Sequence, residues 1–68
     1  MGGSVAQNIR NFRNKKGITQ GELAKEIDLS RNTIVNFETA RRDPRVKDLR
    51  KIARALNVPI EQLLAEQQ

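Results

Sequence analysis

The sequence predicts an all-α fold, a compact bundle of five short helices. Apolar residues recur at spacings of three and four in five successive segments, which is the period of an amphipathic helix. Residues that favour helix ends or tight turns separate these segments, notably Gly17, Asp28, Asn57 and Pro59. The chain has 68 residues and no cysteine, so its small core must hold without a disulfide. Helices with short connections are the most economical way to build such a core.

The first helix is expected to run from Val5 to Lys16. Ile9 and Phe12 follow Val5 at spacings of four and three, so these residues form its buried stripe. Gly17 ends the helix, because glycine readily takes the left-handed conformation that follows a helix C-terminus.

A second helix is expected to begin at Thr19, which forms a capping box with Glu22 three residues later. Asp28 then takes the left-handed conformation of a tight turn, and Leu29 is buried beneath it. The buried stripe of this helix consists of Leu23, Ala24 and Ile27.

Ser30 is a natural N-cap for a third helix, which continues to Thr39. Ile34, Phe37 and Glu38 share its inner side. The outer side is polar, and its side chains are not needed to build the core of the fold. Its side chains can donate and accept hydrogen bonds and contact methyl groups; they are Asn32, Val35, Asn36 and Thr39, with Arg31 at the amino-terminal edge.

A polar loop containing Pro44 leads to a fourth helix from about Val46 to Leu56. Its expected buried stripe is Val46, Leu49, Ile52, Ala53 and Leu56. Asn57 is a left-handed stop, and Pro59 suits the first turn of the last helix. The inward residues of that helix are expected to be Ile60, Leu63 and Leu64.

Residues 5–66 are therefore expected to form a single domain. The preceding residues 1–4, Met-Gly-Gly-Ser, are interpreted as a flexible lead-in or a tag remnant, and residues 67–68 as a frayed tail.

The charge of the chain is positive and unevenly distributed. Thirteen Lys and Arg against eight Asp and Glu give a net charge of +5. All thirteen basic residues and six of the acidic ones lie in residues 1–56, which include the second and third helices. This distribution favours a surface for phosphates, although a basic small protein can also be simply soluble.

The composition excludes several functional classes. Histidine and cysteine are both absent, which removes disulfides, thiolate and imidazole metal ligands and the commonest general base. No nucleophile-base constellation appears, so we expect neither an enzyme nor a cofactor. No apolar run approaches the ~20 residues of a membrane span, and no charged start followed by an apolar stretch indicates a signal peptide. We expect a cytoplasmic, nucleoid-associated protein without a small-molecule ligand.

Two stretches resemble the Cro/C1-type (XRE family) helix-turn-helix of phage repressors and small prokaryotic regulators. They are I-R-N-F-R-N-K-K-G-I-T-Q-G-E-L-A-K-E-I-D-L-S-R-N-T-I-V-N-F-E and K-D-L-R-K-I-A-R-A-L-N-V-P-I-E-Q-L-L. The chain departs from the family pattern at Asp28, where glycine is common, and at Thr39-Ala40, where Asn-Gly is common. Ala40 makes the end of the third helix the least certain boundary.

The resemblance implies a lambda-repressor-like fold whose second and third helices form the helix-turn-helix. It also implies sequence-specific binding of double-stranded DNA by a transcriptional regulator, a repressor, with the helix at about 31–39 in the major groove. We expect a homodimer on a near-palindromic operator, with the last helix as the leading candidate for the dimer surface.

The site residues fall into two groups. Base contacts are expected from Arg31, Asn32, Val35 and Asn36. Phosphate contacts are expected from Arg10, Thr19, Gln20, Thr33, Thr39, Arg41, Arg42 and Arg45. Each could instead be an ordinary solvated side chain, and Val35 could pack partly against the neighbouring helix.

Glu38 lies on the inner side of the third helix, where a carboxylate is costly unless it is paired. Arg13 is the expected partner, and the resemblance implies a partly buried ion pair with a structural role.

The alternative to DNA binding is a protein-binding adaptor or an antitoxin-like module with the same fold. Such a protein would present a contiguous apolar patch to its partner.

Overall fold

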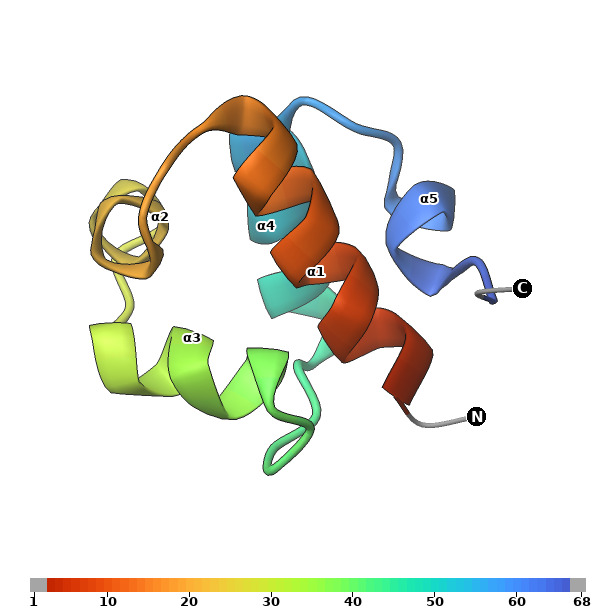
Figure 1. Ribbon diagram of the computed structural model, residues 1–68, viewed down its shortest axis with the longest axis horizontal. Coiled ribbons are helices and arrows are strands. Elements are labelled where there is room, and N and C mark those ends of the chain that lie inside the picture. Colours follow the sequence, from red (N-terminus) through yellow and green to blue (C-terminus); the bar gives the residue numbers. More distant parts are fainter. Residues whose placement is uncertain (1–2, 67–68) are drawn as a thin grey trace.

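Helix α1 (Gly3–Lys16) crosses the middle of the molecule and packs against three of the other helices (Figure 1). The computed structural model describes residues 3–66, which form five helices and no strand. The others are α2 (Gln20–Glu26), α3 (Arg31–Glu38), α4 (Val46–Leu56) and α5 (Ile60–Leu64). Of these, α2 packs against α3 and α4. The predicted five-helix, all-α fold is thereby confirmed. α1 begins two residues before the predicted start at Val5, and the lead-in at residues 1 and 2 and the tail at 67–68 lie outside the described residues.

The predicted start of α2 and the turn after it are confirmed. Thr19 Oγ1 accepts a hydrogen bond from Glu22 N at 3.0 Å, and Thr19 N donates to Glu22 Oε1 at 2.8 Å, so both halves of the capping box are present. Asp28 has φ 61°, the left-handed conformation expected of the turn. Ser30 caps α3 by accepting a hydrogen bond from Thr33 N at 3.1 Å.

Helix α3 ends one residue before the predicted boundary. Its last residue is Glu38, Thr39 is the C-cap, and Ala40 takes the left-handed conformation with φ 60°. The amides of Arg41 and Arg42 then donate to Asn36 O at 2.9 and 3.2 Å, which satisfies a carbonyl in the last turn. Alanine thus occupies a position that usually favours glycine.

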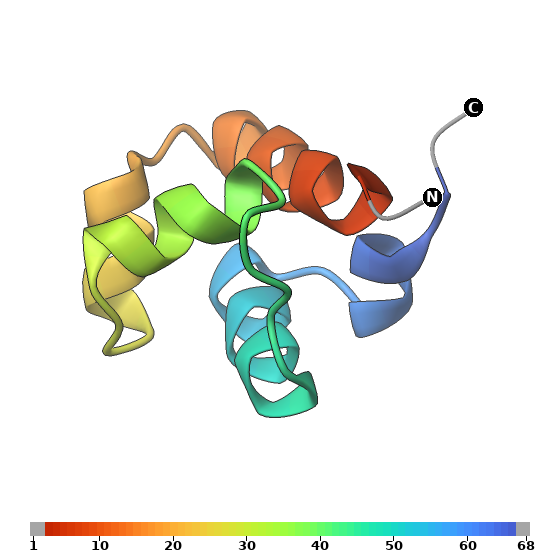
Figure 2. The same ribbon diagram turned by 90° about the horizontal axis from the view of Figure 1, so that it is seen from below.

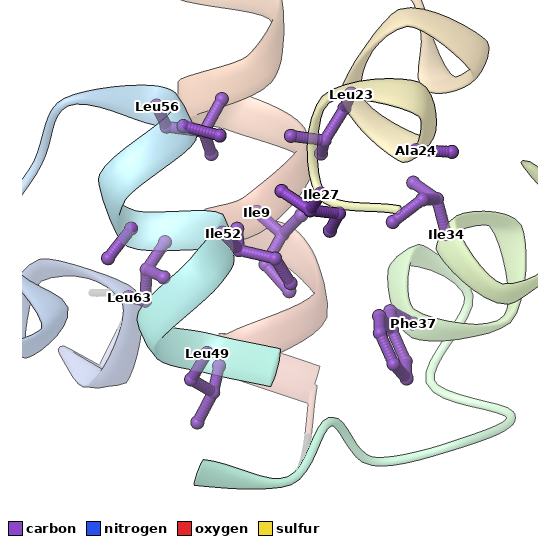
Figure 3. Packing of buried hydrophobic residues seen from close by; sticks show 12 residues of the cluster. Ile9, Leu23, Ala24, Ile27, Ile34, Phe37, Leu49, Ile52, Leu56 and Leu63 are labelled. Carbon is purple, nitrogen blue, oxygen red and sulfur yellow. The ribbon is translucent and has the colours of Figure 1, made fainter. Parts of the chain in front are cut away.

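All five helices contribute to one hydrophobic core (Figure 3). In Figure 1, α2 and α5 lie on opposite sides of α1, α3 runs along the lower edge, and α4 lies behind α1. The view from below in Figure 2 separates α1 from α4 and shows α3 with the loop that follows it. The largest fully buried side chains are Phe37, Ile9, Leu23, Ile34, Ile52 and Leu63.

Two residues predicted to be inward are exposed. Val46 is 62% exposed because it begins α4, whose amino-terminal end projects from the body of the molecule (Figure 2). Leu64 is 51% exposed because it lies one residue, about 100° of helix rotation, beyond Leu63, which takes the inward position. Both predictions of burial were therefore wrong.

A buried asparagine joins the first helix to the last. Asn8 is 2% exposed, and its Nδ2 donates to Leu63 O at 2.9 Å and to Ala65 O at 2.6 Å. These bonds satisfy carbonyls at the end of α5. Asn8 therefore holds the carboxyl-terminal helix against α1.

None of the helices within residues 3–66 has both the length and the hydropathy that crossing a membrane requires.

Candidate nucleic-acid interface

Helix α3 has one buried side and one open side. Ile34, Phe37 and Glu38 are buried. On the other side Arg31 and Asn32 are exposed, whereas Val35 and Asn36 are half-buried. In Figure 1 the other helices lie above α3 and only the loop that follows it extends below its carboxyl-terminal end, so no other helix covers its lower side. The four residues proposed for base contact thus lie on one helix and within two turns.

An ion pair, as well as apolar packing, holds the inner side of helix α3 against the rest of the domain. Arg13 Nε donates to Glu38 Oε2 at 2.6 Å, and Arg13 Nη2 donates to Glu38 Oε1 at 3.0 Å. The side chains are 11% and 2% exposed, respectively. Arg13 Nη1 also donates to Ile18 O at 2.7 Å, so the same guanidinium fixes the loop before α2. The predicted partner of Glu38 is the one that the structure places beside it.

Gln20, a candidate phosphate contact, takes part in the same network. It is the first residue of α2 and is half-buried, and its Nε2 donates to Glu38 Oε1 at 3.0 Å. A carboxylate only accepts hydrogen bonds, so Glu38 orients the Gln20 side-chain amide with its nitrogen toward the carboxylate. Since the nitrogen carries two hydrogens, one remains available for a phosphate.

The three candidate threonines already have hydrogen bonds within the chain. Thr19 Oγ1 caps α2. The hydroxyl oxygens of Thr33 and Ser30 lie 2.8 Å apart and form a hydrogen bond with each other. Thr39 Oγ1 donates to Val35 O at 2.8 Å. A phosphate contact by Thr39 would therefore have to replace its bond to Val35 O. The hydrogen bonds of the three threonines therefore stabilise the ends of α2 and α3.

The candidate arginines are exposed and lie around α3. Arg41, Arg42 and Arg45 belong to the loop between α3 and α4, and Arg10 lies on α1. The Arg42 guanidinium lies over the Phe37 ring, 5.8 Å from its centroid, so this side chain is partly fixed.

The helix-turn-helix itself carries no positive excess. Helix α2 has one lysine against two glutamates, Asp28 follows it, and α3 has only Arg31 against Glu38. The positive charge lies in the flanking segments, on α1, in the loop at 41–45 and on α4. This refines the distribution expected from the sequence, since the basic residues surround the two helices instead of lying on them.

Comparison with known proteins identifies relatives with the same fold. A family model described as helix-turn-helix matches residues 9–63. A protein of Archaeoglobus fulgidus named as an uncharacterized HTH-type transcriptional regulator is 47% identical over 55 residues, which cover 81% of this chain and 79% of that protein.

Two solved structures are similar over most of both chains. The hypothetical transcription factor NHTF from Neisseria has a TM-score of 0.93 and 36% identity, covering 98% of this chain and 77% of that chain. The P22 c2 repressor, solved in complex with a synthetic operator, has a TM-score of 0.82 and 27% identity, covering 87% and 89%. The family match spans four fifths of the residues and includes the capped helices, the left-handed turn and the open side of α3. The chain belongs to the helix-turn-helix family of the Cro/C1 type.

Proposed function

We propose that this protein is a transcriptional regulator that binds double-stranded DNA sequence-specifically through the outer side of α3. The observation that carries this proposal is the contrast between the two sides of α3. The inner side is fixed by Ile34, Phe37 and the Arg13–Glu38 ion pair, and the outer side is polar and open. The major groove is about 12 Å wide and admits one α-helix.

The residue types on this side suit direct contact with base edges. Arg31 can donate two hydrogen bonds to guanine, and Asn32 and Asn36 can each pair with adenine. The methyl groups of Val35 can contact a thymine methyl. Because Asn36 and Val35 are half-buried, their reach is short, and they would contact bases only if α3 enters the groove deeply.

Phosphate contacts would set the position of α3. Arg10, Arg41, Arg42 and Arg45 supply exposed cations, and Gln20 supplies the oriented N–H described above. An arginine that neutralises a phosphate contributes about −0.9 to the slope of log affinity against log salt. Gln20 is neutral, so its loss lowers affinity without changing that slope.

The similarity to the P22 c2 repressor favours repression as the outcome of binding. We expect two copies of the chain to occupy a near-palindromic operator. A protein acting on DNA in this way would work in the cytoplasm, at the nucleoid.

The adaptor alternative has less support. Among the described residues, the exposed large hydrophobic side chains are Val46 and Leu64, at the start of α4 and the end of α5. The outer side of α3 contains neither, so it lacks the contiguous apolar patch that a protein partner would need.

The proposal is tested by selecting binding sites from a random duplex pool with the wild-type protein and with Asn32→Ala. We expect the wild type to select one palindromic sequence and the variant to lose preference at one position per half-site. Asn14→Ala, an exposed asparagine on α1, is the matched control and should leave the preference unchanged. The proposal is wrong if the wild-type protein enriches no sequence, or if Asn14→Ala changes the preference as much as Asn32→Ala.

A further inference from the structure

The outer side of α4 carries a stripe of basic residues that the proposed function does not use. The four residues lie at spacings of three, one and three, which places them on one side of a helix. They are all exposed, and this basic stripe consists of Lys47, Arg50, Lys51 and Arg54. The buried residues Leu49, Ile52, Ala53 and Leu56 lie on the opposite side of α4.

The charge of the basic stripe is only partly offset by neighbouring carboxylates. Asp48 is buried on the inner part of α4 and accepts a hydrogen bond from Arg45 N at 3.2 Å. Glu26 and Asp28 face Lys51 and Arg54 across a cleft between α2 and α4. No ion pair joins the stripe to these or other acidic residues in the described part of the chain. Helix α4 therefore exposes four cations, with two carboxylates near its carboxyl-terminal end.

The basic stripe faces a different direction from the outer side of α3. α3 runs along the lower edge of the molecule in Figure 1, whereas α4 lies behind α1 and runs upward from its first residue. In Figure 2, which looks at the molecule from the α3 side, α4 lies below α1 in the view. Its buried side packs against the other helices, so its outer side points away from the core. Because α3 lies along the lower edge in Figure 1 and α4 runs upward, the amino-terminal end of α4 is nearer to a duplex on α3 than its carboxyl-terminal end.

We propose that the basic stripe binds the phosphates of a second segment of duplex DNA, without sequence preference, while α3 occupies its site. Lys47 and Arg54 are separated by seven residues, roughly 10 Å along the helix axis. One DNA strand presents a phosphate about every 3.4 Å of axis, so about three phosphates face a stripe of this length. Such contacts need only cations, which is what the outer side of α4 offers.

Duplex DNA fits this side of α4 better than an acidic protein does. The centre of a protein interface is usually apolar, with charged residues at the rim. Val46, the first residue of α4, is the exposed large hydrophobic side chain nearest the basic stripe in sequence, and the stripe itself contains none. A surface of cations without an apolar centre is suited to a phosphate backbone.

The test uses a double variant, Lys51→Gln/Arg54→Gln, in the carboxyl-terminal half of the stripe. The matched control is Lys15→Gln/Lys25→Gln, which removes the same charge from exposed positions outside the stripe. A duplex with the selected site is immobilised, and the protein-dependent capture of a labelled duplex of unrelated sequence is measured at increasing salt.

We expect the double variant to lower capture of the unrelated duplex roughly tenfold at low salt and to reduce its salt slope by about 1.8, at about 0.9 per lost contact. Binding to the selected site should stay within about threefold of the wild type, as should both measurements for the control. Glu26→Gln should strengthen capture, because it removes a carboxylate beside Lys51 and Arg54.

A second measurement separates this inference from the proposed function. Asn32→Ala/Asn36→Ala removes the base contacts of α3, and its direct binding to the unrelated duplex is measured in solution. This binding should persist and should fall when Lys51→Gln/Arg54→Gln is added, even if no selected site exists. The inference is overturned if the stripe variant captures the second duplex as the wild type does, or if the control loses as much. The inference is also overturned if Lys51→Gln/Arg54→Gln weakens binding to the selected site as much as it weakens capture of the unrelated duplex. It is equally overturned if the wild-type protein binds poly-L-glutamate more tightly than duplex DNA and the stripe variant loses that preference.

Discussion

Ala40 holds a backbone conformation that alanine disfavours. Its φ of 60° places it in the left-handed region, directly after the C-cap of α3. An L-residue with a Cβ atom pays roughly 1–2 kcal/mol for this conformation. The chain accepts this cost where the amides of Arg41 and Arg42 close the helix on Asn36 O.

We expect Ala40→Gly to stabilise the protein by about 0.5–1 kcal/mol, because relief of the left-handed strain exceeds the extra entropy of glycine in the unfolded chain. The free energy of unfolding is measured by chemical denaturation. Ala65→Gly is the control, since Ala65 is also exposed but has φ −66° and should lose stability on substitution. A loss of stability in Ala40→Gly would show that the conformation is not strained in solution.

Glu38 is the acidic residue whose loss should cost most. It accepts hydrogen bonds from Arg13 and Gln20 while only 2% of its side chain is exposed. Removal of one partner of a buried ion pair typically costs about 3–5 kcal/mol, because the other charge is left buried. We expect Glu38→Ala to lower the melting temperature much more than Val35→Ala, a truncation of a half-buried side chain on the same helix.

Replacement of the whole pair is the complementary measurement. Arg13→Met/Glu38→Leu should recover most of the stability that Glu38→Ala loses, since no charge remains unpaired. Equal melting temperatures for Glu38→Ala and Val35→Ala would contradict a structural role for the ion pair.

At the scale of the element, α5 depends on α1 for its position. α5 has five residues, too few to be stable alone, and Leu63 is its one fully buried side chain. The two hydrogen bonds from Asn8 to Leu63 O and Ala65 O supply the polar part of the attachment.

We expect Asn8→Ala to cost about 1–3 kcal/mol, because it leaves a buried carbonyl without its donor. Amide hydrogen exchange in α5 should accelerate more than in α3, since the lost bonds are local to α5. Asn11→Ala, an exposed asparagine on the same helix, is the control. Uniform acceleration across the five helices would instead indicate a global loss of stability.

The elements were predictable from the sequence to the extent that local signals determine them. Each of these signals involves only residues close together in the sequence, and each is found as predicted: the capping box of Thr19 and Glu22, the left-handed Asp28 and the N-cap Ser30. The errors lie at helix ends, where tertiary position decides burial. Val46 and Leu64 continue apolar stripes in the sequence, but α4 extends past the core at Val46, and the adjacent Leu63 takes the inward position in α5 instead of Leu64.

The candidate site was predictable by its side of α3, whereas the partners of its residues were not. The period of 3.6 residues separates Ile34 and Phe37 from Asn32 and Asn36 without reference to other helices. The bond from Gln20 to Glu38, the fit of Asn8 beneath α5 and the position of Arg42 over Phe37 join residues from different segments. Helical spacing within one segment cannot specify such contacts.

At the scale of the whole molecule, the domain measures 29 × 23 × 21 Å. Adjacent major-groove segments on the same side of DNA are about 34 Å apart, which is more than any dimension of this domain. One copy is therefore too small to span both half-sites, and two copies side by side have room to occupy successive turns. This comparison of sizes supports the proposal of a two-fold arrangement on the operator.

The two-copy arrangement predicts a dependence of affinity on the spacing of the half-sites. Insertion of about 5 base pairs between them, half a helical turn, would move the second half-site to the opposite side of the duplex. We expect cooperative binding to be lost, with affinity falling to that of a single half-site. Insertion of about 10 base pairs, a full turn, restores the side but not the distance, so it controls for the altered sequence. Gel-shift titrations distinguish these cases, because a single half-site gives one shifted species that saturates without cooperativity. If affinity were the same at all three spacings, the copies would bind independently, and specificity would have to come from one α3 helix alone.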